Sequence, residues 1–151
     1  MKKERRIARE LALKFLFPLE VGGEPETSLR NRMENCGDEA CSYAKFLVKG
    51  IMERKDEIDK LLSSSTRRNF HNLLPIEKVL LRMGALEILT GLKPSTAINE
   101  AVELAKKYGE VSSYRLINAI LDSLVRRLQG GKIAGERSKK GESEKTGGTG
   151  L

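Results

Sequence analysis

Apolar residues along this chain return every three or four positions, and no segment alternates apolar and polar residues with a period of two. The stretch AINEAVELAKKYG, 97–109, is typical: Ile98, Ala101, Val102 and Ala105 fall on one helical face, and charged residues fall between them. No Asn-Gly or Asp-Gly hairpin signal interrupts the pattern. The spacing predicts an all-α fold of about six or seven helices.

Breaks in the pattern suggest how these helices are grouped. A first helix is expected over 3–20, although Pro18 would kink it or end it early. A long helical pattern runs over 38–62, and the polar segment SSSTRRN at 63–69 follows it. This segment divides the chain into halves of similar size. We therefore expect two packed three-helix subdomains, at about 1–65 and 66–129, in a body spanning 1–129.

Turn residues predict where the later helices begin and end. Pro75 suits a first helical turn, and Gly91 and Gly109 suit helix ends. Hydroxyl side chains are expected to cap three helices, from Thr27 or Ser28, Ser95 or Thr96, and Ser112 or Ser113. The segment 130–151 is rich in Gly, Lys, Glu and Ser, with almost nothing to bury, and it predicts a disordered tail.

The composition limits the class of partner and the compartment. The formal net charge is +7 and the sequence pI is about 9.5, which favours an anionic partner, with nucleic acid first and a membrane surface second. No apolar run is long enough to span a membrane, and no signal-peptide pattern follows the basic N-terminus. We expect a cytoplasmic protein without a membrane partner.

The residues that could carry chemistry are few. Cys36 and Cys41 are the only cysteines and His71 is the only histidine, too few for an ordinary zinc site, so we expect no metal. In a reducing compartment the two cysteines are expected to be free thiols. There is no Gly-rich phosphate loop and no nucleophile elbow, so neither a cofactor nor enzymatic activity is expected.

The first residues carry the strongest charge feature. Arg5, Arg6 and Arg9 fall within five positions, and Arg forks bind phosphate oxygens in a bidentate, salt-dependent way. We expect them on a helix face turned away from the apolar stripe, with Lys2 and Lys3 beside them as further candidate RNA contacts. A solvated basic turn would explain the same residues, and charge alone leaves both interpretations open.

Other polar residues have an ordinary structural interpretation. The segment YGEVSSYR, 108–115, could offer Tyr rings for stacking on unpaired bases, or it could be a capped turn. Asn118, among apolar residues, is expected to be buried with hydrogen-bond partners. Glu100 is expected to complement the helix dipole from a first turn.

Three segments together resemble the bacterial transcription antitermination NusB family. They are RRIARELALKFLFPLE at 5–20, EKVLLRMGALEIL at 77–89, and INEAVELAKKYG followed by INAILD at 117–122. The resemblance implies two helical subdomains and no enzymatic activity. It implies binding of boxA-type RNA in nascent ribosomal transcripts, together with the small-subunit ribosomal protein NusE, within an RNA polymerase antitermination complex.

The resemblance also assigns roles to individual residues. It implies RNA contacts from Arg5, Arg6, Arg9, Ser112, Tyr114 and Arg115. It places Glu77 at the interface with the ribosomal protein. The two RNA regions are expected to form one continuous basic surface.

Two alternatives remain open at this level. A similar domain is fused to ribosomal RNA cytosine methyltransferases, where a catalytic part follows, whereas a disordered tail is expected here. The chain could also be a protein-interaction or self-assembling module, because some members of the family form homodimers. Its charge would then serve solubility alone.

Overall fold

The computed structural model describes residues 2–140, with side chains described as far as residue 130. Within these residues it contains helices and no strand, which confirms the all-α prediction. The elements are α1 (Lys2–Glu20), α2 (Thr27–Glu34), α3 (Glu39–Glu53), α4 (Lys55–Ser63), the 3₁₀ helix η1 (Phe70–Asn72), α5 (Pro75–Leu89), α6 (Pro94–Tyr108) and α7 (Ser113–Lys140).

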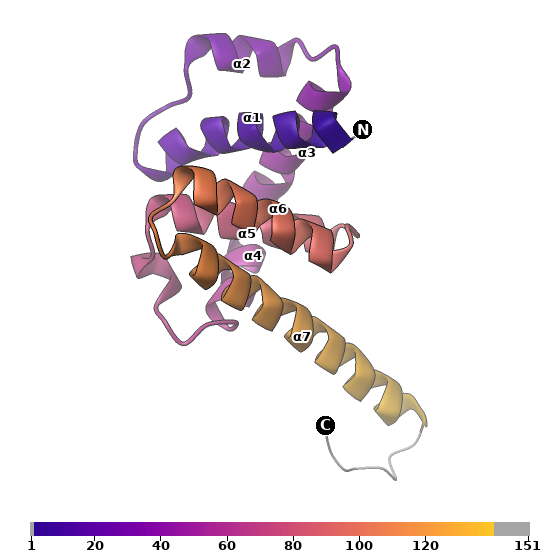
Figure 1. Ribbon diagram of the computed structural model, residues 1–151. Helices are drawn as coiled ribbons and strands as arrows, with labels where there is room; N and C mark the ends of the chain where they lie inside the picture. Colours follow the sequence, from indigo (N-terminus) through magenta and orange to yellow (C-terminus); the bar gives the residue numbers. More distant parts are fainter. Residues whose placement is uncertain (1, 141–151) are drawn as a thin grey trace.

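The helices form a bundle in which α1 lies between α2 and the helices α5 and α6 of the second half of the chain (Figure 1). Helix α1 packs on α3 and on α5, and α2 lies over the outer side of α1. Helix α6 packs on α5 and α7, while α4 packs on α5. One buried apolar cluster connects both halves. The division into two subdomains therefore stays a prediction.

Small residues allow the central helix to pack closely. A Cβ added at Gly84 of α5 would lie 2.7 Å from Leu121 Cδ1 of α7. A Cβ at Gly50 of α3 would lie 2.8 Å from Leu86 Cδ2 of α5. Both distances are shorter than carbon contacts allow, so these glycines set how near α5 comes to its two neighbours.

Helix α1 continues to Glu20 as expected, and Pro18 lies inside it without ending it early. Two other predicted boundaries are wrong. The pattern expected as one long helix is two helices, α3 and α4, because the chain turns at Arg54. Helix α7 continues to Lys140, so the helical part reaches beyond the tail boundary expected at residue 130. The rest of the expected tail, 141–151, lies outside the described residues.

The predicted C-terminal ends of the helices agree with the structure better than the predicted N-caps do. Gly91 has φ +105°, its N–H bonds the Ile88 carbonyl, and the Leu92 N–H bonds the Glu87 carbonyl, which is a Schellman ending. Gly109 ends α6. The hydroxyl caps expected for α2 and α6 are wrong, because Glu26 and Lys93 occupy the N-cap positions without a side-chain cap. Helix α6 begins instead with Pro at its first position.

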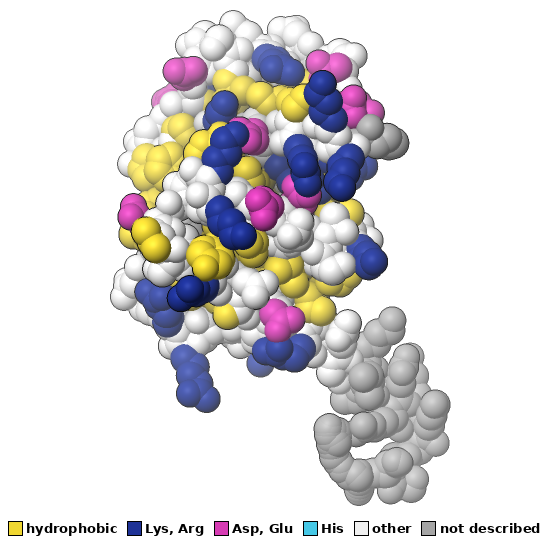
Figure 2. Space-filling model, viewed as in Figure 1, with side chains coloured by type: hydrophobic (Ala, Val, Ile, Leu, Met, Phe, Trp, Pro, Cys, Tyr) yellow, Lys and Arg dark blue, Asp and Glu magenta, His cyan; other side chains and the backbone are white. Residues whose placement is uncertain are grey.

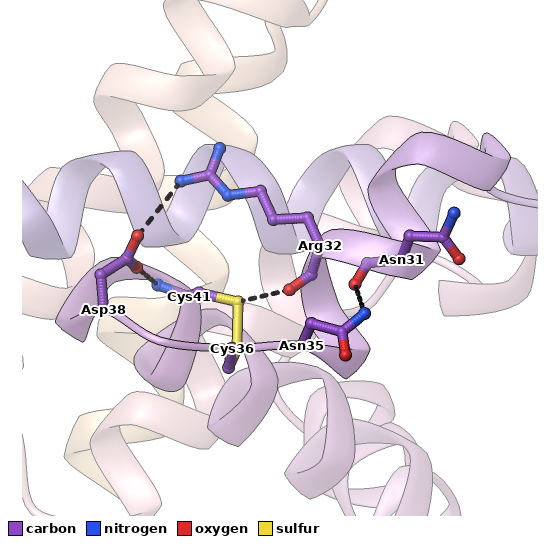
Figure 3. Close-up of a disulfide and its surroundings, with 6 residues drawn as sticks. All are labelled: Asn31, Arg32, Asn35, Cys36, Asp38 and Cys41. Atoms are coloured by element: carbon purple, nitrogen blue, oxygen red, sulfur yellow. Dashed lines mark hydrogen bonds and ion pairs between the residues drawn. A yellow bond between two sulfur atoms is a disulfide. The ribbon is translucent and has the colours of Figure 1, made fainter.

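A disulfide joins Cys36 to Cys41 and closes the turn between α2 and α3 (Figure 3), so the free-thiol expectation is wrong. The Asp38 carboxylate in this turn accepts the Cys41 N–H at 2.7 Å and caps α3. The Sγ atom of Cys41 lies 3.1 Å from the Arg32 carbonyl oxygen at the end of α2. The bridge therefore fixes α2 to the start of α3.

None of the described helices combines the length and the apolar character that crossing a bilayer requires.

We predict that reducing the Cys36–Cys41 bridge lowers the free energy of unfolding by about 2 kcal/mol, the loop-entropy value for a short cross-link. Urea unfolding of the wild-type protein with and without dithiothreitol measures this change. The variant Cys36→Ser serves as the control, since the reductant should leave its unfolding midpoint unchanged. An identical wild-type midpoint in both conditions would contradict the prediction.

Candidate nucleic-acid interface

The three arginines of α1 point in different directions, which the helical spacing alone did not show. Arg9 is buried, with 5% of its surface exposed. Arg5 is half-buried and Arg6 exposed, with 55% of the Arg6 side chain accessible. The single outward-facing strip expected for all three is therefore wrong for Arg9.

Arg9 is buried because two carboxylates from the second half of the chain hold it. Its Nε donates to Glu87 of α5 at 2.9 Å, and its Nη1 lies 3.6 Å from Glu100 of α6. Both carboxylates are buried as well. Burying a charge is costly unless it is paired and hydrogen-bonded, and this arrangement meets both conditions. Arg9 therefore links α1 to α5 and α6.

Tyr43 of α3 extends this network to a third partner helix. Its hydroxyl donates to the Glu87 carboxylate at 2.5 Å, and the Arg5 guanidinium carbon lies 3.8 Å from the centre of its ring. Burial and the bond to Glu87 raise the pKa of Tyr43 to about 12. The Arg5 guanidinium thus lies over an aromatic face, a cation–π contact that Arg favours.

Arg5 reaches toward α3, whereas Arg6 lies on the flank of α1 that faces α6. There Arg6 shares Glu100 with Arg9. Its Nη2 donates to Glu100 Oε2 at 3.2 Å. Glu100 lies beyond the first turn of α6, so its expected role at the helix dipole is wrong, and it acts as a bridge between two arginines. A hollow of about 560 Å³ opens here between α1 and α6, with Lys106 and Lys107 on its rim.

The end of α6 is tied to α1 through Glu10, a residue that the sequence did not single out. Lys107 Nζ and the Tyr108 hydroxyl donate to its two carboxylate oxygens, at 2.7 Å and 2.5 Å. Burial acts to raise the pKa of Glu10, but the bonds from Lys107 and Tyr108 outweigh it and lower the pKa. The periodic pattern gave no sign of this contact, because the partners lie almost a hundred residues apart.

The turn before α7 continues the same surface. Lys106 Nζ lies 5.2 Å from the centre of the Tyr114 ring, and Arg115 Nε donates to the Tyr114 hydroxyl at 3.1 Å. Ser112 and Arg115 are exposed, and Tyr114 is half-buried. Asn118 is exposed, so the expectation that it is buried is wrong. Asn118 lies on the solvent-exposed side of α7, whereas the preceding residue, Ile117, is buried on the inner side.

These contacts bring the two predicted regions together on one face of the molecule. Figure 2 shows Lys and Arg side chains gathered over the start of α1 and along α6, with carboxylates between them. Lys2 and Lys3 are exposed at the start of α1. Several cations of this face keep accessible donors while carboxylates hold their position, as a phosphate-binding surface requires.

Glu77 does not face solvent as an interface residue would. It is buried, accepts the Ser113 hydroxyl at 2.6 Å and accepts the Leu74 N–H at 3.1 Å. Ser113 in turn is the first residue of α7 rather than its cap. The interface role of Glu77 therefore stays a prediction, and its carboxylate holds the start of α5 against the start of α7.

A groove lies directly beside this buried carboxylate. It has a volume of about 950 Å³ and lies between α1, α2 and the starting turn of α5. Phe17, Leu74 and Tyr108 line it and are between 36% and 42% exposed. Figure 2 shows the hydrophobic side chains between α2 and α1. In the part of the chain with described side chains, no cluster of His, Cys, Asp and Glu could hold a metal ion.

We predict that Arg9→Ala destabilises the fold by about 3–5 kcal/mol, because it leaves the Glu87 and Glu100 carboxylates buried without their partner. Arg6→Ala is the matched control: it removes an exposed arginine and should cost about 1 kcal/mol or less. Urea unfolding of both variants measures the difference. Equal losses would show that Arg9 does not hold the helices together.

Tyr43 gives a pH-dependent prediction. Its raised pKa means that its contribution to stability is complete below the ordinary value of 10 and is lost as pH rises through about 12. Tyr43→Phe should remove a phase near pH 12 from the absorbance titration of tyrosinate. Circular dichroism recorded in parallel shows whether the chain is still folded. A wild-type titration unchanged by the substitution would refute the assignment.

A family model, individual proteins and solved structures that match this chain carry the same family name. A family model described as the NusB family matches residues 6–126. The transcription antitermination protein NusB of Symbiobacterium thermophilum is 32% identical over 146 residues, which cover 87% of this chain and 95% of that protein. The corresponding protein of Bdellovibrio bacteriovorus is 36% identical over 128 residues, covering 80% and 93%.

Solved structures resemble the fold as well. A chain in a crystal structure of the antitermination factors NusB and NusE in complex with dsRNA matches with a TM-score of 0.71 and 26% identity, covering 84% of this chain and 99% of that one. The structure of T. maritima NusB matches with a TM-score of 0.70 and 28% identity, covering 81% and 90%.

Proposed function

The chain belongs to the NusB family, and we propose that it is a transcription antitermination factor that binds boxA-type single-stranded RNA of nascent ribosomal transcripts together with NusE. It is not an enzyme, as the family's members are named transcription factors. In this proposal it works in the cytoplasm as part of the RNA polymerase antitermination complex.

One observation carries the RNA part of the proposal: charged contacts connect the start of α1, the end of α6 and the start of α7. Arg6 meets Glu100, Glu10 meets Lys107, and Lys106 lies over Tyr114. The result is a connected row of cations with an aromatic ring beside it. Such a row can hold a phosphate backbone while Tyr114 offers a stacking surface for a base.

The groove beside Glu77 supports the protein part of the proposal. NusE would bind between α1 and α2, over the exposed apolar side chains of Phe17, Leu74 and Tyr108. Glu77 would act indirectly there, because it fixes the turn that carries Leu74. A similar chain occurs in a structure with both NusE and RNA, which fits two separate surfaces on one molecule.

A protein-interaction module, or a homodimer that covers the arginines, is the competing proposal, and the same groove favours it. The two proposals differ in what the cations do. If charge serves only solubility, RNA binding should depend on the number of cations removed and not on where they lie.

We predict that Arg6→Ala with Arg115→Ala weakens binding to a labelled boxA-type oligonucleotide and lowers the slope of log affinity against log salt by about 1.4, since each lost phosphate contact removes about 0.7. Fluorescence anisotropy over a salt series, with and without NusE, gives both quantities. The control is Arg30→Ala with Arg54→Ala, which removes the same charge from α2 and the turn after α3.

The outcomes separate the proposals. A loss confined to the first pair supports the RNA surface. Equal losses from both pairs indicate a general charge effect. Absence of salt-dependent RNA binding in the wild-type protein, with NusE binding retained, would reject RNA binding and leave the interaction module.

A further inference from the structure

Arg5 borders a second hollow that the proposed RNA surface does not use. This hollow has a volume of about 430 Å³ and lies between α1, α3 and the turn that follows α5. Arg5, Tyr43 and Phe46 line one part, and the turn at residues 90–92 lines the other. Arg5 and Arg6 are consecutive, yet Arg6 lines the hollow on the opposite flank of α1. The start of α1 therefore separates two hollows, one lined by Arg5 and the other by Arg6 and Arg9.

The hollow contains a stack of flat groups. The Arg5 guanidinium lies 3.8 Å from the centre of the Tyr43 ring, and the Tyr43 and Phe46 rings are stacked with centroids 5.5 Å apart and planes 23° apart. Phe46 is 44% exposed, an uncommon position for a Phe on a helix surface. Arg5 Nε is buried and makes no hydrogen bond within the described residues. The hollow thus offers an exposed aromatic ring next to a stacked guanidinium.

We propose that this hollow, which we call the Phe46 hollow, takes one unpaired nucleobase of an RNA strand that crosses the start of α1. The inference rests on the proposed function and extends it to a base-binding subsite. The base would stack on the Phe46 ring, while Arg5 would donate to the base or to the adjacent phosphate. Stacking on aromatic and guanidinium planes is how proteins hold splayed single-stranded bases.

Charge favours RNA over a peptide as the occupant. Arg5 is the only charged side chain among the residues that line the hollow. The Glu87 carboxylate, which binds the Tyr43 hydroxyl and Arg9, does not line the hollow. Lys2 and Lys3 lie exposed at the same end of α1. An RNA strand on Arg6 can therefore continue toward Arg5 over a cationic surface.

The test uses the absence of tryptophan from this sequence. Phe46→Trp introduces a single indole whose emission reports on a stacked base. Titration with the boxA-type oligonucleotide should quench this emission, and the same oligonucleotide with abasic sites, which keeps every phosphate, should bind without quenching. Met52→Trp is the matched control: it places an indole on the same helix, at a residue 59% exposed but outside the Phe46 hollow, and should not be quenched.

The affinity of Phe46 variants for the oligonucleotide provides a second test. Phe46→Leu keeps an apolar side chain without an aromatic face and should weaken RNA binding about tenfold, the usual effect of losing one stacked base, while Phe46→Trp should retain affinity. Melting curves establish that the variants fold. If the hollow takes a peptide, Phe46→Leu binds RNA as the wild type does and loses affinity for the protein partner.

A failure of the base-binding inference can be distinguished from a failure of the proposed function. If wild-type protein binds RNA in a manner that depends on Arg6, but Phe46→Trp is not quenched and Phe46→Leu binds normally, the base-binding inference is wrong and the proposed function stands. If wild-type protein does not bind RNA at all, the proposed function fails and the inference fails with it.

Discussion

The buried contact of Arg9 with Glu87 and Glu100 determines how the N-terminal helix lies on the rest of the molecule. An ion pair of this kind gains little over an apolar contact, because both charges lose their water. Its effect is on geometry, since a guanidinium between two carboxylates allows one orientation of α1 against α5 and α6. The register of α1 then fixes on which flank each of its other arginines lies.

The same carboxylates decide which cations remain available for a ligand. Glu87 is used by Arg9 and Tyr43, and Glu100 is shared between Arg9 and Arg6. Arg6 therefore keeps most of its side chain in solvent. Arg5 is stacked on Tyr43 and lines the Phe46 hollow. Of the three arginines, Arg9 therefore stabilises the fold, whereas Arg5 and Arg6 can contact a polyanion.

Two kinds of surface follow from this arrangement. The cationic row along α1, α6 and the start of α7 is polar and suits a phosphate backbone. The groove between α1 and α2 is lined mostly by apolar side chains, with a few charged ones among them, and suits a protein. The disulfide at Cys36 fixes the end of α2 and therefore one wall of that groove. A factor that binds RNA and a protein together needs two such surfaces on one rigid body.

Helical periodicity and the glycine endings at Gly91 and Gly109 were sufficient to predict an all-α fold, and the excess of basic residues favoured an anionic partner. They depend on neighbours within a few positions, which the sequence displays directly. The burial of Arg9, the indirect role of Glu77 and the disulfide were decided by tertiary structure. In the first two, the deciding partners lie dozens of residues away, and a side chain's exposure depends on which carboxylate reaches it. Bridge formation depends on how near the α2–α3 turn brings its two sulfur atoms, which spacing alone leaves open.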